Sequence, residues 1–247
     1  MPAVPNQFCF VRTIRFSSWY HRRVFDWLRK KAARPTREIR DTLFGDMALG
    51  EWPPGDAVVP PWSIFVAVRR SVEAGRADDA QIHLRQVLEL PNLESRHYLQ
   101  AWHELRRLGV QPTTEAKRLL GVVVEVALDE GLDLLAAYAD HSVRYFNFSG
   151  AAVIWEHPDE SLDRYIDNLL VAASGILEKV GPWEGHRPPA PPKGHARLNM
   201  MTPGGLFFGQ GPISVLSRDP LAAPAILAAT ELMKVLIQKS EVARNAG

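Results

Sequence analysis

Residues 121–128, GVVVEVAL, decide the fold of this chain, because a continuous β-branched run of this length is typical of a buried strand. Two further apolar runs follow at 132–139 and 143–148, and Asp140-His141-Ser142 between them has the composition of a tight turn. A tight turn makes the strands on either side antiparallel neighbours. With the next apolar run, AAVIWE, residues 121–156 are predicted to form a meander of three or four strands.

Downstream of the meander, helical periodicity and turn residues alternate. Pro158, followed by two acidic residues, is expected to open a long helix, and TPGG at 202–205 is typical of a hairpin turn. After Asp219-Pro220 the chain is apolar on most sides, as a largely covered helix is. We therefore predict an α+β domain over 121–247, with a helix at 158–180, a hairpin at 195–210 and a helix at 220–240.

Residues 62–120 carry helical periodicity instead. Apolar residues recur at spacings of three and four on both sides of Gly75, which supplies a left-handed stop between two antiparallel helices. A third helix is expected from about Glu94 to Leu108. These helices are expected to share one core with the sheet, because a lone hairpin plus one helix buries little surface by itself.

The predicted helical hairpin at 62–92 resembles a tetratricopeptide repeat. The similarity rests on an aromatic residue in the first helix, Gly75 at the turn, Ala80 just after it, and VLELPN at 87–92, which is similar to the family's ALELDPN ending. The resemblance implies either a surface that binds peptides or a hairpin that packs against a neighbouring domain.

The order of strands, helix, hairpin and helix over 121–240 is similar to that of the profilin-like, longin and roadblock group. This resemblance is one of topology and rests on no shared motif. It implies an antiparallel sheet that carries helices and serves as a surface for dimerisation or recruitment. It transfers no functional residue to this chain.

Charge is distributed unevenly along the chain. The formal charge is +1, yet residues 1–40 hold ten Lys or Arg against two acids. Apolar residues lie at helical spacing among these cations, so residues 1–43 are predicted to form a basic amphipathic arm. Such an arm suits an anionic membrane surface or nucleic acid, and it also suits docking onto the acidic remainder of the chain. The residues expected to make these contacts are Arg22, Arg23, Trp27, Arg29 and Lys30.

Two proline-rich stretches are expected to connect these parts. Residues 44–61, FGDMALGEWPPGDAVVPP, contain four prolines and three glycines without sustained periodicity, which is typical of a linker or a surface loop. Residues 185–194, GHRPPAPPKG, are expected to form an extended connector. The P-x-x-P pattern in this connector would also suit an aromatic groove.

Glu125 is the candidate site residue that interrupts the apolar strand. By alternation it shares a face with Val123 and Ala127, and Arg144 or Arg197 would pair with it if their faces coincide. If the chain is an enzyme, its site is expected to assemble on this sheet face. The candidate catalytic residues are then Glu125, His141, Arg144 and Arg197. The alternative is a solvated sheet face with ordinary cross-strand pairing.

Neither a metal nor a cofactor is predicted. Cys9 is the single cysteine, so an internal disulfide is excluded. His97 and His103 are six residues apart, whereas two ligands on one helical face need a spacing of three or four. Both are expected to be solvated or at the edge of the core. Asp140, His141 and Ser142 have the residue types of a hydrolytic triad, but adjacent turn residues cannot align as one.

The function favoured by these patterns is that of a non-enzymatic interaction, regulatory or adaptor protein. Its expected partner is another protein, and the sheet also suits a homodimer. The chain has no run of about 18 apolar residues, so it is expected to be soluble and cytoplasmic. Two alternatives stay open: an enzyme with a site on the sheet face, and recruitment to a membrane or nucleic acid through the basic arm.

Overall fold

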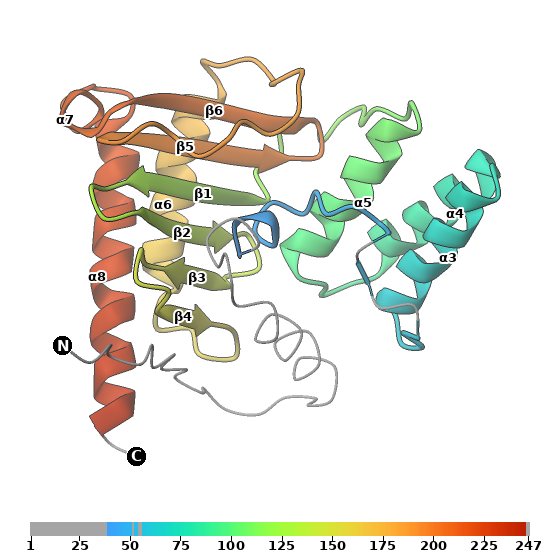
Figure 1. The fold of residues 1–247 in the computed structure, drawn as a ribbon, viewed down its shortest axis with the longest axis horizontal. Helices are drawn as coiled ribbons and strands as arrows, with labels where there is room; N and C mark the ends of the chain where they lie inside the picture. The colour runs from blue at the N-terminus through green and yellow to red at the C-terminus, as the bar shows by residue number, and fades with distance from the viewer. Residues whose placement is uncertain (1–38, 51, 54–55, 246–247) are drawn as a thin grey trace, which may run out of the picture.

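The computed structural model describes residues 39–50, 52–53 and 56–245, and the predicted arm contacts of Arg22, Arg23, Trp27, Arg29 and Lys30 lie outside them (Figure 1). At its centre is a six-stranded antiparallel sheet. Helices α6 and α8 cover one face, and the helices α3, α4 and α5 lie together on the other side of the molecule (Figure 1). The α+β fold class is therefore confirmed.

The sheet has the strand order β4-β3-β2-β1-β5-β6, and every neighbouring pair is antiparallel. The predicted meander supplies four strands, and the predicted hairpin supplies the last two. Helix α6 lies between the meander and the hairpin in the chain. After this helix the chain returns to the sheet, and β5 pairs with β1 at its centre. The strands are β1 (Gly121–Ala127), β2 (Leu132–Tyr138), β3 (Val143–Phe146), β4 (Ala152–Trp155), β5 (His195–Thr202) and β6 (Gly205–Pro212).

The first face of the sheet is covered by α6 (Asp163–Leu177) and α8 (Ala223–Asn245), with the short α7 (Ile213–Leu216) beside β6. Alternate side chains of β1, such as Val122 and Val124, pack against the apolar stripe of α6. Each of these fully buried aliphatic side chains contributes about 1.5–3 kcal/mol relative to exposure. The sequence predicts an apolar stripe of seven residues for the helix at 158–180, and the structure confirms it: Val180 is partly buried, and six are buried, namely Leu162, Ile166, Leu169, Ala173, Ile176 and Leu177.

The boundaries of two predicted helices differ from the structure. The helix expected at 158–180 begins at Asp163, because Asp159 accepts a hydrogen bond from the Ser161 amide (2.9 Å) and holds the preceding residues in turns. The helix expected at 220–240 begins at Ala223 and continues to Asn245. Helix α7 was not predicted, because four residues give no helical period to detect.

The second face of the sheet is covered by residues 43–49 and α5. Leu43 and Phe44 pack with Leu99 of α5 against the sheet, and Tyr138 of β2 donates a hydrogen bond to the Leu43 carbonyl (2.8 Å). The prediction of a linker or surface loop over 44–61 does not include the burial of Phe44, which packs with the sheet, or of Leu49, which packs with α3, α4 and α5. It agrees with the structure at Val58 and Val59, which are exposed.

Helices α3 (Trp62–Glu73), α4 (Ala77–Glu89) and α5 (Ser95–Arg107) pack around Phe65, Leu84 and Leu105. The turn after α3 has Gly75 at φ +70°, as the left-handed stop requires. Within the described residues this helical cluster is distinct from the two that flank the sheet, but α5 also places Leu99 in the cluster on the second face, so the helices and the sheet share that part of the core. None of the described helices is long and apolar enough to cross a membrane.

Candidate functional site

A buried carboxylate with several donors around it occupies the second face of the sheet. Glu125 of β1 has no exposed surface, and Arg197 of β5 stands directly opposite it, with Nη1 3.3 Å from Oε2. Asn199 Nδ2 donates to the same oxygen (3.1 Å), and Arg40 binds both carboxylate oxygens. We call Glu125, Arg40, Arg197 and Asn199 the Glu125 clasp. The cross-strand pairing of Glu125 with Arg197 follows from the alternation that the sequence predicts.

The Glu125 clasp is closed by main-chain carbonyls of the proline-rich connector. Arg40 Nη2 donates to the Pro188 carbonyl (2.7 Å) and Arg197 Nη1 to the Pro189 carbonyl (2.8 Å). Burial lowers the pKa of Arg197, although the Glu125 charge opposes that shift. These bonds direct the guanidinium groups to partners inside the protein. The clasp therefore fixes the connector and the chain around Arg40 against the sheet.

Arg144 takes part in a different cluster, at the joint between α5 and the sheet. Its Nη2 lies 3.2 Å from Glu94 and 3.1 Å from Glu156. Burial tends to raise the pKa of Glu94, but the charges of Arg96 and Arg144 outweigh it and hold that pKa well below its usual range. This cluster ties the start of α5 to β3.

The tight turn predicted at Asp140-His141-Ser142 is confirmed. Asp140 Oδ1 accepts the Ser142 amide (3.1 Å), and His141 adopts φ +58°, in the left-handed region. The His141 ring lies against α6, with Nε2 2.9 Å from Asp167. Of the four candidate catalytic residues, the structure thus brings together only Glu125 and Arg197, while Arg144 and His141 belong to two other clusters.

His97 is buried, which differs from the expectation of a solvated or core-edge histidine. The Trp62 ring lies edge-on at 4.5 Å between centroids, and Trp52 stacks at 6.5 Å, so two tryptophans that precede and open α3 cover the imidazole. Burial lowers the pKa of His97 to about 4. Neither His97 nor His103 belongs to a metal-ligand set within the described residues.

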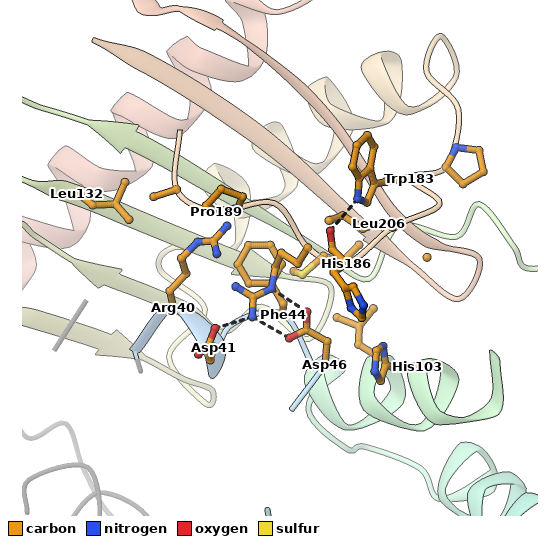
Figure 2. Close-up of a pocket in the computed structure, with 18 of the residues that line it drawn as sticks. Arg40, Asp41, Phe44, Asp46, His103, Leu132, Trp183, His186, Pro189 and Leu206 are labelled. Carbon is orange, nitrogen blue, oxygen red and sulfur yellow. Dashed lines mark hydrogen bonds and ion pairs between the residues drawn. The ribbon is translucent and has the colours of Figure 1, made fainter. Parts of the chain in front are cut away.

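An open cleft of about 1900 Å³ lies between α5, the chain around residues 40–48, the β1–β2 turn and the connector. Figure 2 shows Phe44, Leu132, Trp183 and Leu206 around it. The sequence does not indicate this cleft, because its walls come from segments far apart in the chain, none of which carries a recognisable motif.

Ion pairs neutralise charged groups of the cleft wall. Arg187 Nη2 lies 2.7 Å from Asp41 and its Nε lies 2.7 Å from Asp46, with the guanidinium 4.4 Å from the Phe44 ring centroid (Figure 2). Lys193 lies 3.1 Å from Asp129. The wall also carries large apolar side chains that face solvent, namely Leu128, Phe148 and Trp183. The cleft thus offers apolar contacts beside two cations, Arg187 and Lys193, that are already paired with carboxylates.

No family model, no curated protein and no solved structure matches this chain. Both resemblances given by the sequence, to a tetratricopeptide hairpin and to the profilin-like group, therefore stay predictions.

Proposed function

We propose that this protein is a non-catalytic adaptor or regulatory protein that holds an extended segment of another protein in the cleft. The observation that carries this proposal is that three large apolar side chains exposed to solvent, Leu128, Phe148 and Trp183, line the same cleft. Leu128 and Phe148 lie near the β1–β2 turn, and Trp183 lies beside Leu206, towards the other end of the sheet. Exposed apolar side chains that line one concave surface mark interaction sites more often than singly scattered ones do.

The charge arrangement of the cleft favours a polypeptide over nucleic acid. A nucleic-acid site needs cations available to phosphates, whereas Arg187 and Lys193 already pair with carboxylates of the wall. Aromatic rings such as Trp183 supply large contact area at low entropic cost, and the apolar body of a peptide side chain fits such a surface. The favoured ligand is therefore a peptide segment with at least one large apolar side chain.

The closed state of the Glu125 clasp supports a non-catalytic role. A general acid or base needs to reach a substrate proton within about 3 Å, but the Glu125 carboxylate is fully buried beneath Arg40, Arg197 and the connector. The alternative of an enzyme with Glu125 and Arg197 at its active site would require this clasp to open.

Affinity capture from the native host with cleft variants tests the proposal. We expect the full chain to capture a protein in stoichiometric amount, and Trp183→Ala with Phe148→Ala to lose it. The matched control is Val171→Ala, because Val171 is also exposed but lies on α6, on the first face of the sheet. Hydrogen exchange in the purified complex should show protection at residues 182–187 and 128–132.

Other outcomes of the capture would point elsewhere. Equal capture by the wild-type chain, the cleft variant and the control would remove the cleft from the interface. Recovery of a second copy of this chain would indicate a homodimer. Salt-sensitive recovery of nucleic acid or lipid would transfer the function to the basic arm at residues 1–43.

A further inference from the structure

We propose that His141, His157 and Asp163 form a binding site for one divalent transition-metal ion of the zinc class. This site lies on the α6 side of the sheet and is independent of the cleft. Among the residues that the structure describes, these three form the one group of His, Cys, Asp or Glu side chains whose ligand atoms all lie within 4.8 Å of one another.

The spacing of the ligand atoms fits tetrahedral coordination. Ligands at 2.0–2.1 Å from a zinc ion stand about 3.3 Å apart. His157 Nε2 lies 3.3 Å from Asp163 Oδ1, and His141 Nδ1 lies 3.5 Å from the other oxygen of the same carboxylate, Oδ2. With one ligand atom taken from each residue, all three atoms still lie within 4.8 Å of one another. The pairs of ligand atoms are thus at most about 1.5 Å wider than the tetrahedral separation, a change that small side-chain rotations supply.

The fold holds each of the three ligands on a different segment. His141 lies on the β2–β3 turn, His157 follows β4, and Asp163 is the first residue of α6. The two imidazole rings lie nearly parallel, 24° apart, with centroids separated by 5.4 Å. A bound ion would cross-link the meander to the helix that covers it, so binding is expected to stabilise this end of the sheet.

A partner for the outer nitrogen of His141 is already in place. When Nδ1 of His141 faces the ion, Nε2 is free to donate, and it lies 2.9 Å from Asp167 Oδ1, one turn further along α6. Metal-binding histidines usually donate their second N–H to a carboxylate in this way, which orients the ring and increases its basicity. Asp167 is therefore a positioning residue of the site.

An unsatisfied oxygen of Asp163 favours a metal site over a simple cluster of histidines and acids. Its Oδ1 is buried and accepts no hydrogen bond from any described residue, although the His157 ring nitrogen lies beside it. A carboxylate oxygen that is shielded from water and still lacks a donor has an unused acceptor position. A cation at this position would satisfy it.

The donor set selects the class of ion. Two imidazoles and one carboxylate suit zinc and other late first-row divalent ions, whereas Mg²⁺ and Ca²⁺ prefer oxygen ligands alone. His141, His157 and Asp163 are all partly exposed, so an ion can enter from solvent and keep a water as its fourth ligand. Affinity is expected to be higher for Zn²⁺ than for Fe²⁺ or Mn²⁺.

The test is titration of the untagged full chain with Zn²⁺ against a chromophoric chelator. We expect one Zn²⁺ per chain and a higher melting temperature on binding. His157→Ala and Asp163→Asn should weaken binding more than about 100-fold, while Asp167→Ala should weaken it about 10-fold through the ring of His141. The matched control is His83→Ala. His83 is a partly exposed histidine on α4, away from the proposed site, and its ring lies 3.3 Å from the Gln86 side chain.

Replacing Zn²⁺ with Co²⁺ gives a spectroscopic readout of coordination. If His157 only stabilised the fold, its replacement would leave the Co²⁺ spectrum of the folded protein unchanged. The visible absorption bands of tetrahedral Co²⁺ are expected with the wild-type chain and His83→Ala, and are expected to disappear with His157→Ala. Circular dichroism of each variant without metal checks that it is folded. The proposal would be overturned if the wild-type chain bound Zn²⁺ no more tightly than His157→Ala. It would also be overturned if His83→Ala lost as much Zn²⁺ affinity as His157→Ala.

Discussion

Glu125 places a full negative charge where the protein leaves no exposed surface, and its two arginines compensate for the lost hydration. Removal of the anion in Glu125→Ala would leave Arg40 and Arg197 buried without their counter-ion. We expect the free energy of unfolding to fall by about 3–5 kcal/mol, measured by urea denaturation.

An exposed ion pair supplies the control for Glu125→Ala. Asp129 pairs with Lys193 at the surface, so Asp129→Ala should change the free energy of unfolding by less than about 1 kcal/mol. Similar urea midpoints for the two variants would mean that the Glu125 clasp contributes no more than an ordinary surface pair.

His97 makes stability depend on pH. Its pKa is about 4 in the folded chain, against an ordinary value near 6.5. As pH falls below 6.5 the unfolded chain binds this proton first, so stability is full above pH 6.5 and is lost towards pH 4. We expect a loss of about 2 kcal/mol between pH 7 and pH 5, measured by urea midpoints.

The variant His97→Gln should reduce the slope of stability against pH in this window. Part of the slope should remain, because burial also lowers the pKa of His103 to about 4. An unchanged slope in His97→Gln would show that the buried imidazole is not its source.

The sequence predicts some partners of these residues and misses others. Strand alternation predicts that Glu125 faces Arg197, because both residues lie on regular strands with a fixed period. Arg40 and His157 could not be predicted as partners of Glu125 and His141, since Arg40 lies in a short helical stretch and His157 follows β4, and no sequence spacing relates either residue to its partner. Arg40 is 85 residues away from Glu125 in the chain, and no local spacing indicates such a contact.

At the scale of the element, the close approach of residues 43–49 to α5 depends on Gly45. Its φ is +62°, and an added Cβ would lie 2.7 Å from Leu99 Cβ and 2.9 Å from the Arg96 carbonyl. We expect Gly45→Ala to cost about 2–4 kcal/mol, from left-handed strain together with overpacking, measured by chemical denaturation.

Gly75 is the matched control for Gly45. It also has a left-handed φ, +70°, but an added Cβ meets nothing within 4 Å. Gly75→Ala should therefore cost only the backbone term of about 1–2 kcal/mol. Equal losses in the two variants would show that contact with α5 is not the source of the extra cost.

The elements with a clear period are those that the sequence predicts best. The strands of 121–156, the hairpin at 195–210 and the helix from Glu94 all have the expected type and position. Residues 44–61 and 185–194 have no period, so the sequence predicts a linker or surface loop for the first stretch and an extended connector for the second. Their order comes instead from remote partners, as when Gln100 of α5 exchanges two hydrogen bonds with the main chain of Met47.

At the scale of the whole molecule, the helical array and the sheet are expected to unfold together. Helix α5 contributes to both parts: its Leu99 packs with the sheet, and its Leu105 packs with α3 and α4. Ser95 at the start of α5 and Asp140 after β2 also exchange two hydrogen bonds. Circular dichroism at 222 nm and tryptophan fluorescence should therefore give coincident urea transitions. Two separated transitions would show that the array is an independent unit.

The position of α8 at the end of the described chain has a consequence for synthesis on the ribosome. The four strands of the meander and α6 are translated well before α8, which supplies Ala225, Ala229, Leu232 and Leu236 to the same cluster. Until this helix emerges from the ribosome, part of the apolar first face of the sheet stays uncovered in the nascent chain. Such intermediates are the species that aggregate or recruit chaperones, so translation that stops before residue 223 should yield insoluble protein.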